Sequence, residues 1–355
     1  MVSLFVAAMM GELTLRVFMK DRINLFPRFH DSVNYGEFTI RRYRPGIEFW
    51  HTSVDGRWRF EINNKGFRDS DDYRYEKQEG VLRILALGDS HTSGYEVRQE
   101  FSFPELIEND LQRRGVNANV LNTGIAGFST AEELVYLENE GIKYDPDFVI
   151  VGFYANDFDD NIKAGLFGLE DGALVVRKKT HIPGIRVHRI VGSVGILRWL
   201  SQHSYFYSFG FNTAYELAKK ALLSKAQAKL QTELAVATTE DVGKYEKDLM
   251  RALLSRMFNF CKDHGITLIL IDIPRITNAG QPIRSSIPES MLDDFRSSSD
   301  ILLHSHDVMR AFVDNPGDMH VPHGHRHISE VAHMVIAQAV SDVISSSENS
   351  NEKRP

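Results

Sequence analysis

The sequence predicts an α/β protein in which a parallel sheet carries helices on both of its faces. From residue 81 onward, short apolar segments of strand length alternate with longer segments whose apolar residues recur at helical spacing. The first short segment, residues 82–88, is almost continuously apolar, which is typical of a strand buried on both faces. Apolar residues make up 43% of the chain and charged residues 25%, so a large core is available. Alternation of this kind indicates a sheet between two helical layers.

Each element follows from a local pattern. The expected strands are apolar runs that end in Gly, Pro or a polar turn, and they cover residues 82–88, 118–124, 147–154, 266–274 and, as a shorter strand, 301–304. The expected helices keep apolar residues three or four positions apart, and they cover residues 103–115, 130–141 and 245–265, with a last helix starting near residue 324.

The alternation does not cover the whole chain. The expected divisions are an apolar N-terminal segment (1–20), a β-rich extension (21–80), a main domain (81–345) with an insertion at about 160–240, and a disordered polar tail (346–355). Short alternating runs broken by Pro-Gly and Asp-Gly indicate hairpins in the extension. The insertion is too long for a plain connection and is rich in Phe, Tyr and Trp. It is expected either to form a lid or wall over the site, or to bury its aromatic residues within a helical pair.

The N-terminal segment leaves three interpretations open. Its apolar run, residues 1–11, is about half of the ~20 residues needed to span a bilayer. It lacks a basic start and a small-residue cleavage site, so a cleaved signal peptide is not indicated. An ordinary amphipathic helix, the remnant of a membrane anchor and an interfacial helix all fit. Membrane association through this segment is therefore a possible partnership, and an extracytoplasmic or membrane-associated location is favoured over the cytoplasm.

Charge and cysteine content exclude several classes of protein. The formal net charge of −7 argues against nucleic-acid binding, which requires a basic surface. Cys261 is the only cysteine, so no intrachain disulfide and no cysteine-based metal or redox motif can form.

Polar residues follow the strands at the edge where ligands bind in open α/β sheets. The first strand is followed by Gly88-Asp89-Ser90, the second by "NTGIAG" (122–127), the third by Asn156 and Asp157, and the last helix is preceded by "DMH" (318–320). Together these residues supply a hydroxyl nucleophile, a histidine base, a carboxylate to orient it, and donors for a developing oxyanion. The sequence therefore predicts nucleophilic catalysis by serine.

The four blocks, in this order, resemble the SGNH-hydrolase superfamily, the GDSL-type esterases and lipases. The resemblance covers about residues 81–345 without the insertion, and implies a three-layer, doubly wound fold of flavodoxin-like type that needs no metal or cofactor. It implies that Ser90 is the nucleophile and His320 the base, with Asp318 as its orienter. The oxyanion donors would be the backbone of Ser90 and Gly127 and the side chain of Asn156.

The last block departs from the usual pattern of this superfamily. Asp318 and His320 are separated by one residue, where Asp-x-x-His is more common, and Gly324 follows at a shorter spacing. His323 is therefore a rival for the base. Asp89 and Asp157 are expected to bond nearby backbone groups and hold their loops, as Asp does well in turns.

The expected function is that of a serine esterase or lipase-like hydrolase that cleaves an O-acyl ester on a glycan or a lipid. One alternative is an O-acyltransferase on the same fold, which would pass the acyl group to a polysaccharide hydroxyl. Another is a metal-dependent phosphoesterase that would use a cluster of histidines, His320, His323, His325, His327 and His333. A dinucleotide-binding protein is not indicated, because the turn after the first strand lacks the Gly-x-Gly-x-x-Gly pattern.

Overall fold

A computed structural model describes residues 2–25, 29–215, 217, 221, 242–275, 283–312, 319–322 and 327–351. At its centre lies a five-stranded sheet in the order β12-β11-β7-β5-β6, and every neighbouring pair of strands is parallel. The strands are β5 (Leu82–Gly88), β6 (Ala118–Asn122), β7 (Phe148–Phe153), β11 (Thr267–Asp272) and β12 (Ile301–Leu303). All five strands predicted from the sequence are confirmed.

The order of the strands determines where a ligand can bind. The first strand of this sheet, β5, lies between the second, β6, and the third, β7, which is the flavodoxin-like order 2-1-3-4-5. The chain therefore leaves β5 in one direction along the sheet and β7 in the other. In open α/β sheets ligands bind at such a switch point, which here lies beyond the carboxyl ends of β5 and β7.

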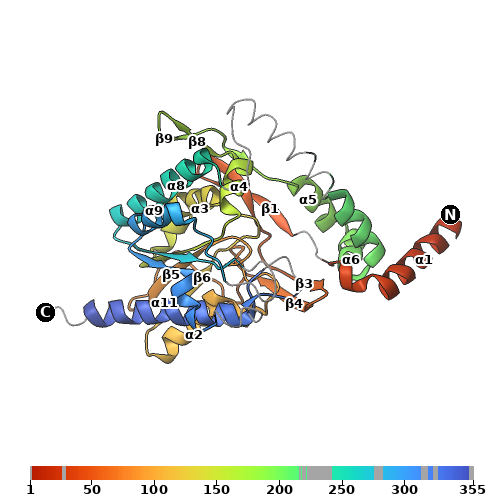
Figure 1. Ribbon diagram of the computed structural model, residues 1–355. Coiled ribbons are helices and arrows are strands. Elements are labelled where there is room, and N and C mark those ends of the chain that lie inside the picture. Colours follow the sequence, from red (N-terminus) through yellow and green to blue (C-terminus); the bar gives the residue numbers. More distant parts are fainter. Residues whose placement is uncertain are drawn as a thin grey trace.

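Helices cover both faces of the sheet (Figure 1). Side chains of β5 alternate between them: Ile84 and Ala86 belong to one apolar cluster, Leu85 and Leu87 to the other. The first cluster is completed by α2 (Phe103–Arg113) and α11 (Glu330–Asn351), and the second includes α3 (Thr130–Asn139), α8 (Lys244–Asp263) and α9 (Leu292–Ser297). The sheet is thus the middle of three layers, as the sequence predicts.

The last helix differs from the prediction at both ends. It begins at Glu330 and not near residue 324, because residues 319–321 first pair with residues 327–329. It continues to Asn351, into the tail for which the sequence predicts disorder; residues 352–355 lie outside the described part of the chain.

The N-terminal extension is β-rich, as predicted. It forms two antiparallel hairpins, β1 (His30–Tyr35) with β2 (Phe38–Tyr43) and β3 (Ile47–Ser53) with β4 (Gly56–Ile62). Its aromatic side chains share the apolar cluster of α3 and α8, so the extension packs on the main domain.

The inserted segment packs against the extension. It contains α4 (Asp157–Ala164), the hairpin β8 (Phe167–Glu170) and β9 (Ala173–Val176), β10 (Thr180–His181), α5 (Ile185–Ser193), α6 (Gly195–His203) and helical residues 205–215. Strand β10 adds to β2 in parallel, and α5 contacts β1. The Ala- and Lys-rich stretch of the insertion lies almost wholly outside the described residues. The short helix α10 (Ser305–Val308) follows β12, and short 3-10 segments occupy residues 20–22, 99–101, 141–144, 289–291 and 310–312.

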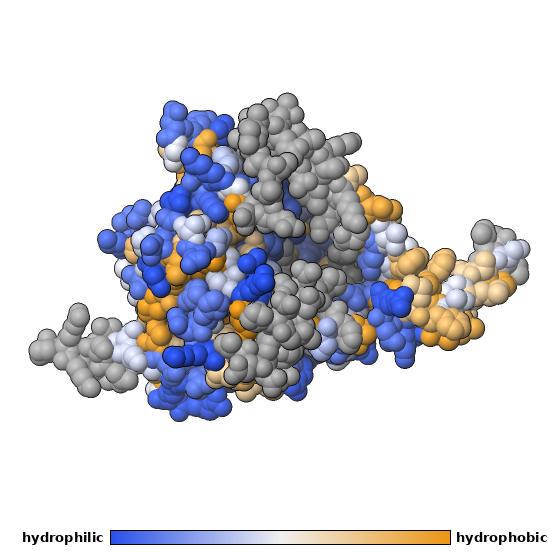
Figure 2. Space-filling model, viewed as in Figure 1, coloured by the Kyte–Doolittle hydropathy of each residue, from blue (hydrophilic) through white to orange (hydrophobic). Residues whose placement is uncertain are grey.

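Helix α1 (Val2–Phe18) joins the inserted helices in a structure that we call the apolar arm: α1, α5, α6 and residues 205–215. Glu12 of α1 accepts hydrogen bonds from the Ser204 hydroxyl and the Phe206 amide, and Arg16 donates to the His203 carbonyl. The arm extends away from the layered body, and apolar residues gather on it (Figures 1 and 2). None of the helices in the described part of the chain has the length and apolar character required to cross a membrane.

Candidate active site

The loop after β5 is seated on the sheet through small residues. Gly88 and Gly152 are partners on β5 and β7, and a Cβ atom on either would overlap the Thr92 hydroxyl. The Thr92 hydroxyl donates to the Leu87 carbonyl in the space that the two glycines leave. Gly124, beyond β6, adds a third close approach, since a Cβ there would lie 2.5 Å from the Ser93 amide nitrogen. Three strand ends therefore fix the loop that carries Ser90.

The two aspartates expected to hold loops do so. Asp89 Oδ1 accepts the His91 amide at 2.8 Å, which closes a turn around Ser90. Asp157 Oδ2 accepts the Tyr154 amide at 3.1 Å beyond the end of β7. Ser90 itself remains partly exposed at the surface of this loop.

The hydroxyl of Ser90 meets His327. The distance from Ser90 Oγ to His327 Nε2 is 2.9 Å, within the range of a strong hydrogen bond. The His327 ring lies 4.9 Å from the ring of His91 and 4.8 Å from the ring of Tyr95, measured between centroids. The histidine is thereby held at the switch point of the sheet.

The histidine that lies beside Ser90 differs from the one expected. The sequence points to His320, but the structure brings His327 there. His320 lies opposite Ile328 in a short antiparallel bridge, and its ring Nδ1 lies 3.0 Å from the Val321 carbonyl. Asp318 and His323, the expected orienter and the rival base, lie outside the described residues.

Within the part of the chain that the structure describes, the carboxylate beside Nδ1 of His327 is one that the sequence analysis missed, Glu96. Glu96 Oε2 is 3.7 Å from His327 Nδ1, and Glu96 Oε1 is 3.2 Å from Nε2 of His51. Burial raises the pKa of the Glu96 carboxyl, but hydrogen bonds from His327 and His51 and the charges of both rings outweigh burial, so this pKa lies below its ordinary value. Glu96 is therefore an ionised carboxylate between two imidazoles.

Sequence signals for these residues are weak. His327 lies three residues before the start of α11, among several histidines, and its sequence neighbourhood does not distinguish it from them. Glu96 lies six residues after Ser90 and His51 lies in the extension, and no local pattern connects them.

Donors for an oxyanion lie on the predicted loops. Among the described residues, the amides of Ser90 and Gly127 donate to no other group. The Asn156 side-chain amide donates to Asp89 at 3.2 Å and to Asp160 at 2.9 Å, so both of its hydrogens are engaged. Burial is the largest influence on Asp89 and raises its pKa to about 6, against the hydrogen bond from His91 and the charge of His327.

The N-terminal extension forms hydrogen bonds with the loop that follows Ser90. Arg68 is buried and donates to the carbonyls of Ser93, Gly94 and Val97. The Tyr43 hydroxyl lies 2.9 Å from Ser93 Oγ. The loop after Ser90 is therefore shaped by residues that precede the sheet in the sequence.

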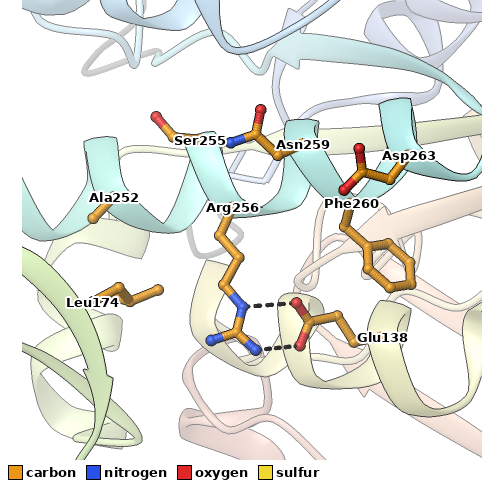
Figure 3. Close-up of a pocket in the computed structure, with 8 residues that line it drawn as sticks. All are labelled: Glu138, Leu174, Ala252, Ser255, Arg256, Asn259, Phe260 and Asp263. Carbon is orange, nitrogen blue, oxygen red and sulfur yellow. Dashed lines mark hydrogen bonds and ion pairs between the residues drawn. The ribbon is translucent and has the colours of Figure 1, made fainter.

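Two other candidates for a functional site are a cavity and the possible metal ligands. A shallow cavity of about 420 Å³ between α3, β9 and α8 contains a bidentate ion pair, in which Arg256 donates to Glu138 at 2.7 Å (Figure 3). Neither Ser90 nor His327 nor Glu96 lines this cavity. In the described ranges no three His, Cys, Asp or Glu side chains are grouped to hold a metal ion; His323 and His325 fall outside those ranges.

Comparisons with known proteins identify the family. A family model described as GDSL-like lipase/acylhydrolase matches residues 84–340. An arylesterase of Vibrio mimicus is 35% identical over 75 residues, which are 21% of this chain and 38% of that protein, so the match spans well under half of its relative.

Two solved structures are similar to the chain at low sequence identity. Esterase EstA from Pseudoalteromonas sp. is 14% identical with a TM-score of 0.40, over 75% of this chain and 98% of that one. Axe2, an acetylxylan esterase from Geobacillus stearothermophilus, is 16% identical with a TM-score of 0.39, over 73% of this chain and 92% of that one. Because both scores are low, the assignment rests on the family model, which spans most of the chain. The chain belongs to the GDSL-like lipase/acylhydrolase family of ester-cleaving hydrolases.

Proposed function

We propose that this protein hydrolyses an O-acyl ester through an acyl-enzyme formed on Ser90, with His327 as the base. The observation that carries the proposal is the 2.9 Å hydrogen bond between Ser90 Oγ and His327 Nε2, at the switch point of the sheet. A serine hydroxyl is a weak nucleophile until a neighbouring base removes its proton, and a histidine at this distance can do so.

The reaction then follows in two balanced halves. Ser90 Oγ attacks the ester carbonyl carbon and its proton passes to His327 Nε2; the carbon–oxygen bond to the alcohol breaks, and the alcohol leaves with that proton. A water molecule attacks the acyl-serine and gives a proton to His327. The bond from the acyl carbon to Ser90 Oγ breaks, the serine recovers the proton, and a carboxylic acid is released.

The developing oxyanion would be stabilised by the amides of Ser90 and Gly127 and by the side chain of Asn156. The first two are available, whereas Asn156 must exchange one carboxylate partner for the substrate oxygen. Its bond to Asp89 is the longer of the two, at 3.2 Å against 2.9 Å to Asp160, and is the one expected to break.

The substrate class that we propose is an O-acyl ester on a glycan or a lipid. The decisive experiment combines labelling and product analysis. A fluorophosphonate probe should modify Ser90, and Ser90→Ala should lose at least about a thousandfold in turnover of p-nitrophenyl esters. Acetylated polysaccharides and phospholipids of increasing chain length should then separate the two substrates, with release of free acid measured directly.

Each alternative function has a distinct outcome in this experiment. Transfer of the acyl group to an added oligosaccharide, in preference to water, would establish an O-acyltransferase. Loss of activity in chelator with recovery on adding metal would establish a metal-dependent phosphoesterase and overturn the serine mechanism. An unlabelled Ser90 in a fully active enzyme would also overturn it.

We further propose that the apolar arm binds the interface of an anionic membrane. Large apolar side chains are exposed on the arm, and grouped exposed apolar residues mark interaction surfaces. Met10, Leu13, Phe18, Ile196 and Trp199 are each more than half exposed. Three aromatic residues of the insertion, Trp199, Phe206 and Phe209, are also exposed and not buried within a helical pair. A helix with such a surface can lie in the interface of a bilayer without crossing it.

The charge of the arm supports an anionic partner. Residues 1–25 and 182–215 contain six Lys or Arg and two Asp or Glu, a net charge of +4 within a chain of net charge −7. Basic residues close to an anionic surface each contribute about 1 kcal/mol of attraction at moderate salt. A membrane-bound arm would keep the ester site close to lipid and cell-surface substrates.

A further inference from the structure

We propose that Glu96 is the carboxylate that orients His327, and that His51 of the N-terminal extension holds Glu96 in position. The acidic member of the site would then come from the loop of the nucleophile, and the extension would complete the machinery of the reaction. This inference rests on the proposed roles of Ser90 and His327.

The four side chains form one continuous chain of contacts. Ser90 Oγ lies 2.9 Å from His327 Nε2, His327 Nδ1 lies 3.7 Å from Glu96 Oε2, and Glu96 Oε1 lies 3.2 Å from His51 Nε2. A base must present a lone pair to the serine, so its other nitrogen must hold the proton. Glu96 is on that side of the ring. Catalytic hydrogen bonds are often longer in a free enzyme than in its substrate complex, so we expect the 3.7 Å between His327 Nδ1 and Glu96 Oε2 to shorten when substrate binds.

Glu96 has the charge state that this role requires. It is only 2% exposed, and a buried carboxylate is stable only when it is paired or hydrogen-bonded. His51 supplies a donor at one oxygen, and the imidazolium that forms on His327 during catalysis would supply an opposite charge at the other. Stabilising that imidazolium is the electrostatic task of the acid in a serine triad.

The backbone at Glu96 is held in a costly conformation. Its φ is +63°, in the left-handed region that non-glycine residues seldom occupy. Such residues persist where surrounding structure fixes them, and they concentrate at functional sites. Here Arg68 of the extension donates to the carbonyls of Gly94 and Val97, on either side of Glu96. A glycine would fit this backbone with less strain, so the carboxylate is the feature that distinguishes the position.

His51 ties the extension to this carboxylate. It is fully buried on β3, with its ring 5.6 Å from Trp58 and 4.7 Å from Tyr95 between centroids. The rings fix the plane of the imidazole so that Nε2 points at Glu96. The β-rich extension therefore supplies a positioning residue in addition to its packing surface.

Among the described residues, Asp89 is a second carboxylate that interacts with the charge of His327. Its oxygens already accept the His91 amide and the Asn156 side chain, which are loop contacts. The other described charged or titratable groups that act on these side chains are His91, His333, Arg68, Glu133, Asp157 and Asp160. A test must therefore distinguish Glu96 from Asp89.

The experiment compares matched variants of the full chain with a soluble acetate ester, after Ser90 labelling has been shown in the wild type. Glu96→Gln should lower kcat at least about a hundredfold with little change in KM. It should also move the acidic limb of the kcat/KM profile to lower pH, because loss of the negative charge lowers the pKa of the histidine. Asp89→Asn, whose carboxylate is engaged by the His91 amide and the Asn156 side chain, should move that limb less than Glu96→Gln does.

His51 is tested by removal and restoration of its donor. His51→Phe keeps a ring between Trp58 and Tyr95 and should lower kcat about tenfold, whereas His51→Gln restores an N–H donor and should recover most of it. His188→Phe, which replaces another buried histidine outside the site, is the control and should be fully active. Thermal unfolding of each variant checks folding.

Two results would overturn the inference while leaving the proposed esterase intact: Glu96→Gln with wild-type kcat, or an acidic limb that moves in Asp89→Asn and not in Glu96→Gln. If Glu96→Gln does not fold, Glu96→Ala with wild-type kcat and pH profile would overturn the role of Glu96, and His51→Phe with wild-type kcat would overturn the role of His51. An unlabelled Ser90 in active wild type would instead contradict the proposed function.

Discussion

At the scale of single residues, the proposed chemistry depends on one histidine among several. The ring of His327 lies within hydrogen-bond distance of Ser90 Oγ. His320 is instead paired with Ile328 in a short antiparallel bridge. His333 is buried and accepts the Phe103 amide at 3.0 Å, which joins α11 to α2. Three neighbouring histidines thus have three different environments, and the distance to Ser90 separates them.

Substituting these histidines one at a time gives a direct test. His327→Ala should lower kcat at least about a thousandfold, because the serine loses its base, while His320→Ala should stay within a few-fold of wild type. Steady-state hydrolysis of p-nitrophenyl acetate measures both. Full activity in His327→Ala, or a dead His320→Ala that remains folded, would contradict the assignment of the base.

At the scale of elements, the nucleophile loop is positioned by the ends of three neighbouring strands. Glycines at or just beyond the ends of β5, β6 and β7 allow the backbone of residues 92–93 to approach the sheet edge closely. Arg68 and Tyr43 hold the opposite side of this loop from the extension. The loop is therefore clamped between the sheet and the extension.

Because the loop is held closely on both sides, we expect a single added methyl group at Gly124 to lower kcat. In Gly124→Ala the new Cβ would lie 2.5 Å from the Ser93 amide nitrogen, which is backbone and cannot turn aside. Displacement of the loop by a fraction of an ångström should lower kcat at least about tenfold. Gly195→Ala is the control, since a Cβ there meets nothing within 4 Å. Measuring kcat and the rate of fluorophosphonate labelling tests both, and unchanged labelling in Gly124→Ala would contradict the clamp.

At the scale of the whole molecule, the arrangement separates a catalytic body from an apolar arm (Figure 2). The arm has its own internal contacts, such as Glu12 with Ser204 and Phe206. Its exposed apolar groups and positive charge lie on a chain that is acidic as a whole. This distribution is what an interfacial binding surface requires.

Vesicle sedimentation tests the arm. The wild type should bind vesicles of phosphatidylglycerol and phosphatidylcholine, and more weakly as salt rises, since screening removes the charge attraction. Leu13→Glu with Trp199→Glu should reduce binding at least about tenfold and leave hydrolysis of a soluble ester unchanged. Val176→Glu, on β9, changes an exposed apolar residue outside the arm and should bind as the wild type does. Equal binding by all variants, or self-association in place of vesicle binding, would contradict the proposal.

The sequence alone determined the class of the fold, the five strands of the sheet and the position of Ser90. It could do so because a strand buried on both faces must be apolar along its whole length, and because the residues after such strands meet at one edge of the sheet. The tertiary structure decided which histidine lies beside that serine and which carboxylate lies beside the histidine. His327, Glu96 and His51 lie on three segments far apart in the chain, and no local periodicity records their approach. Only the packing of the extension and of α11 around the switch point brings them together.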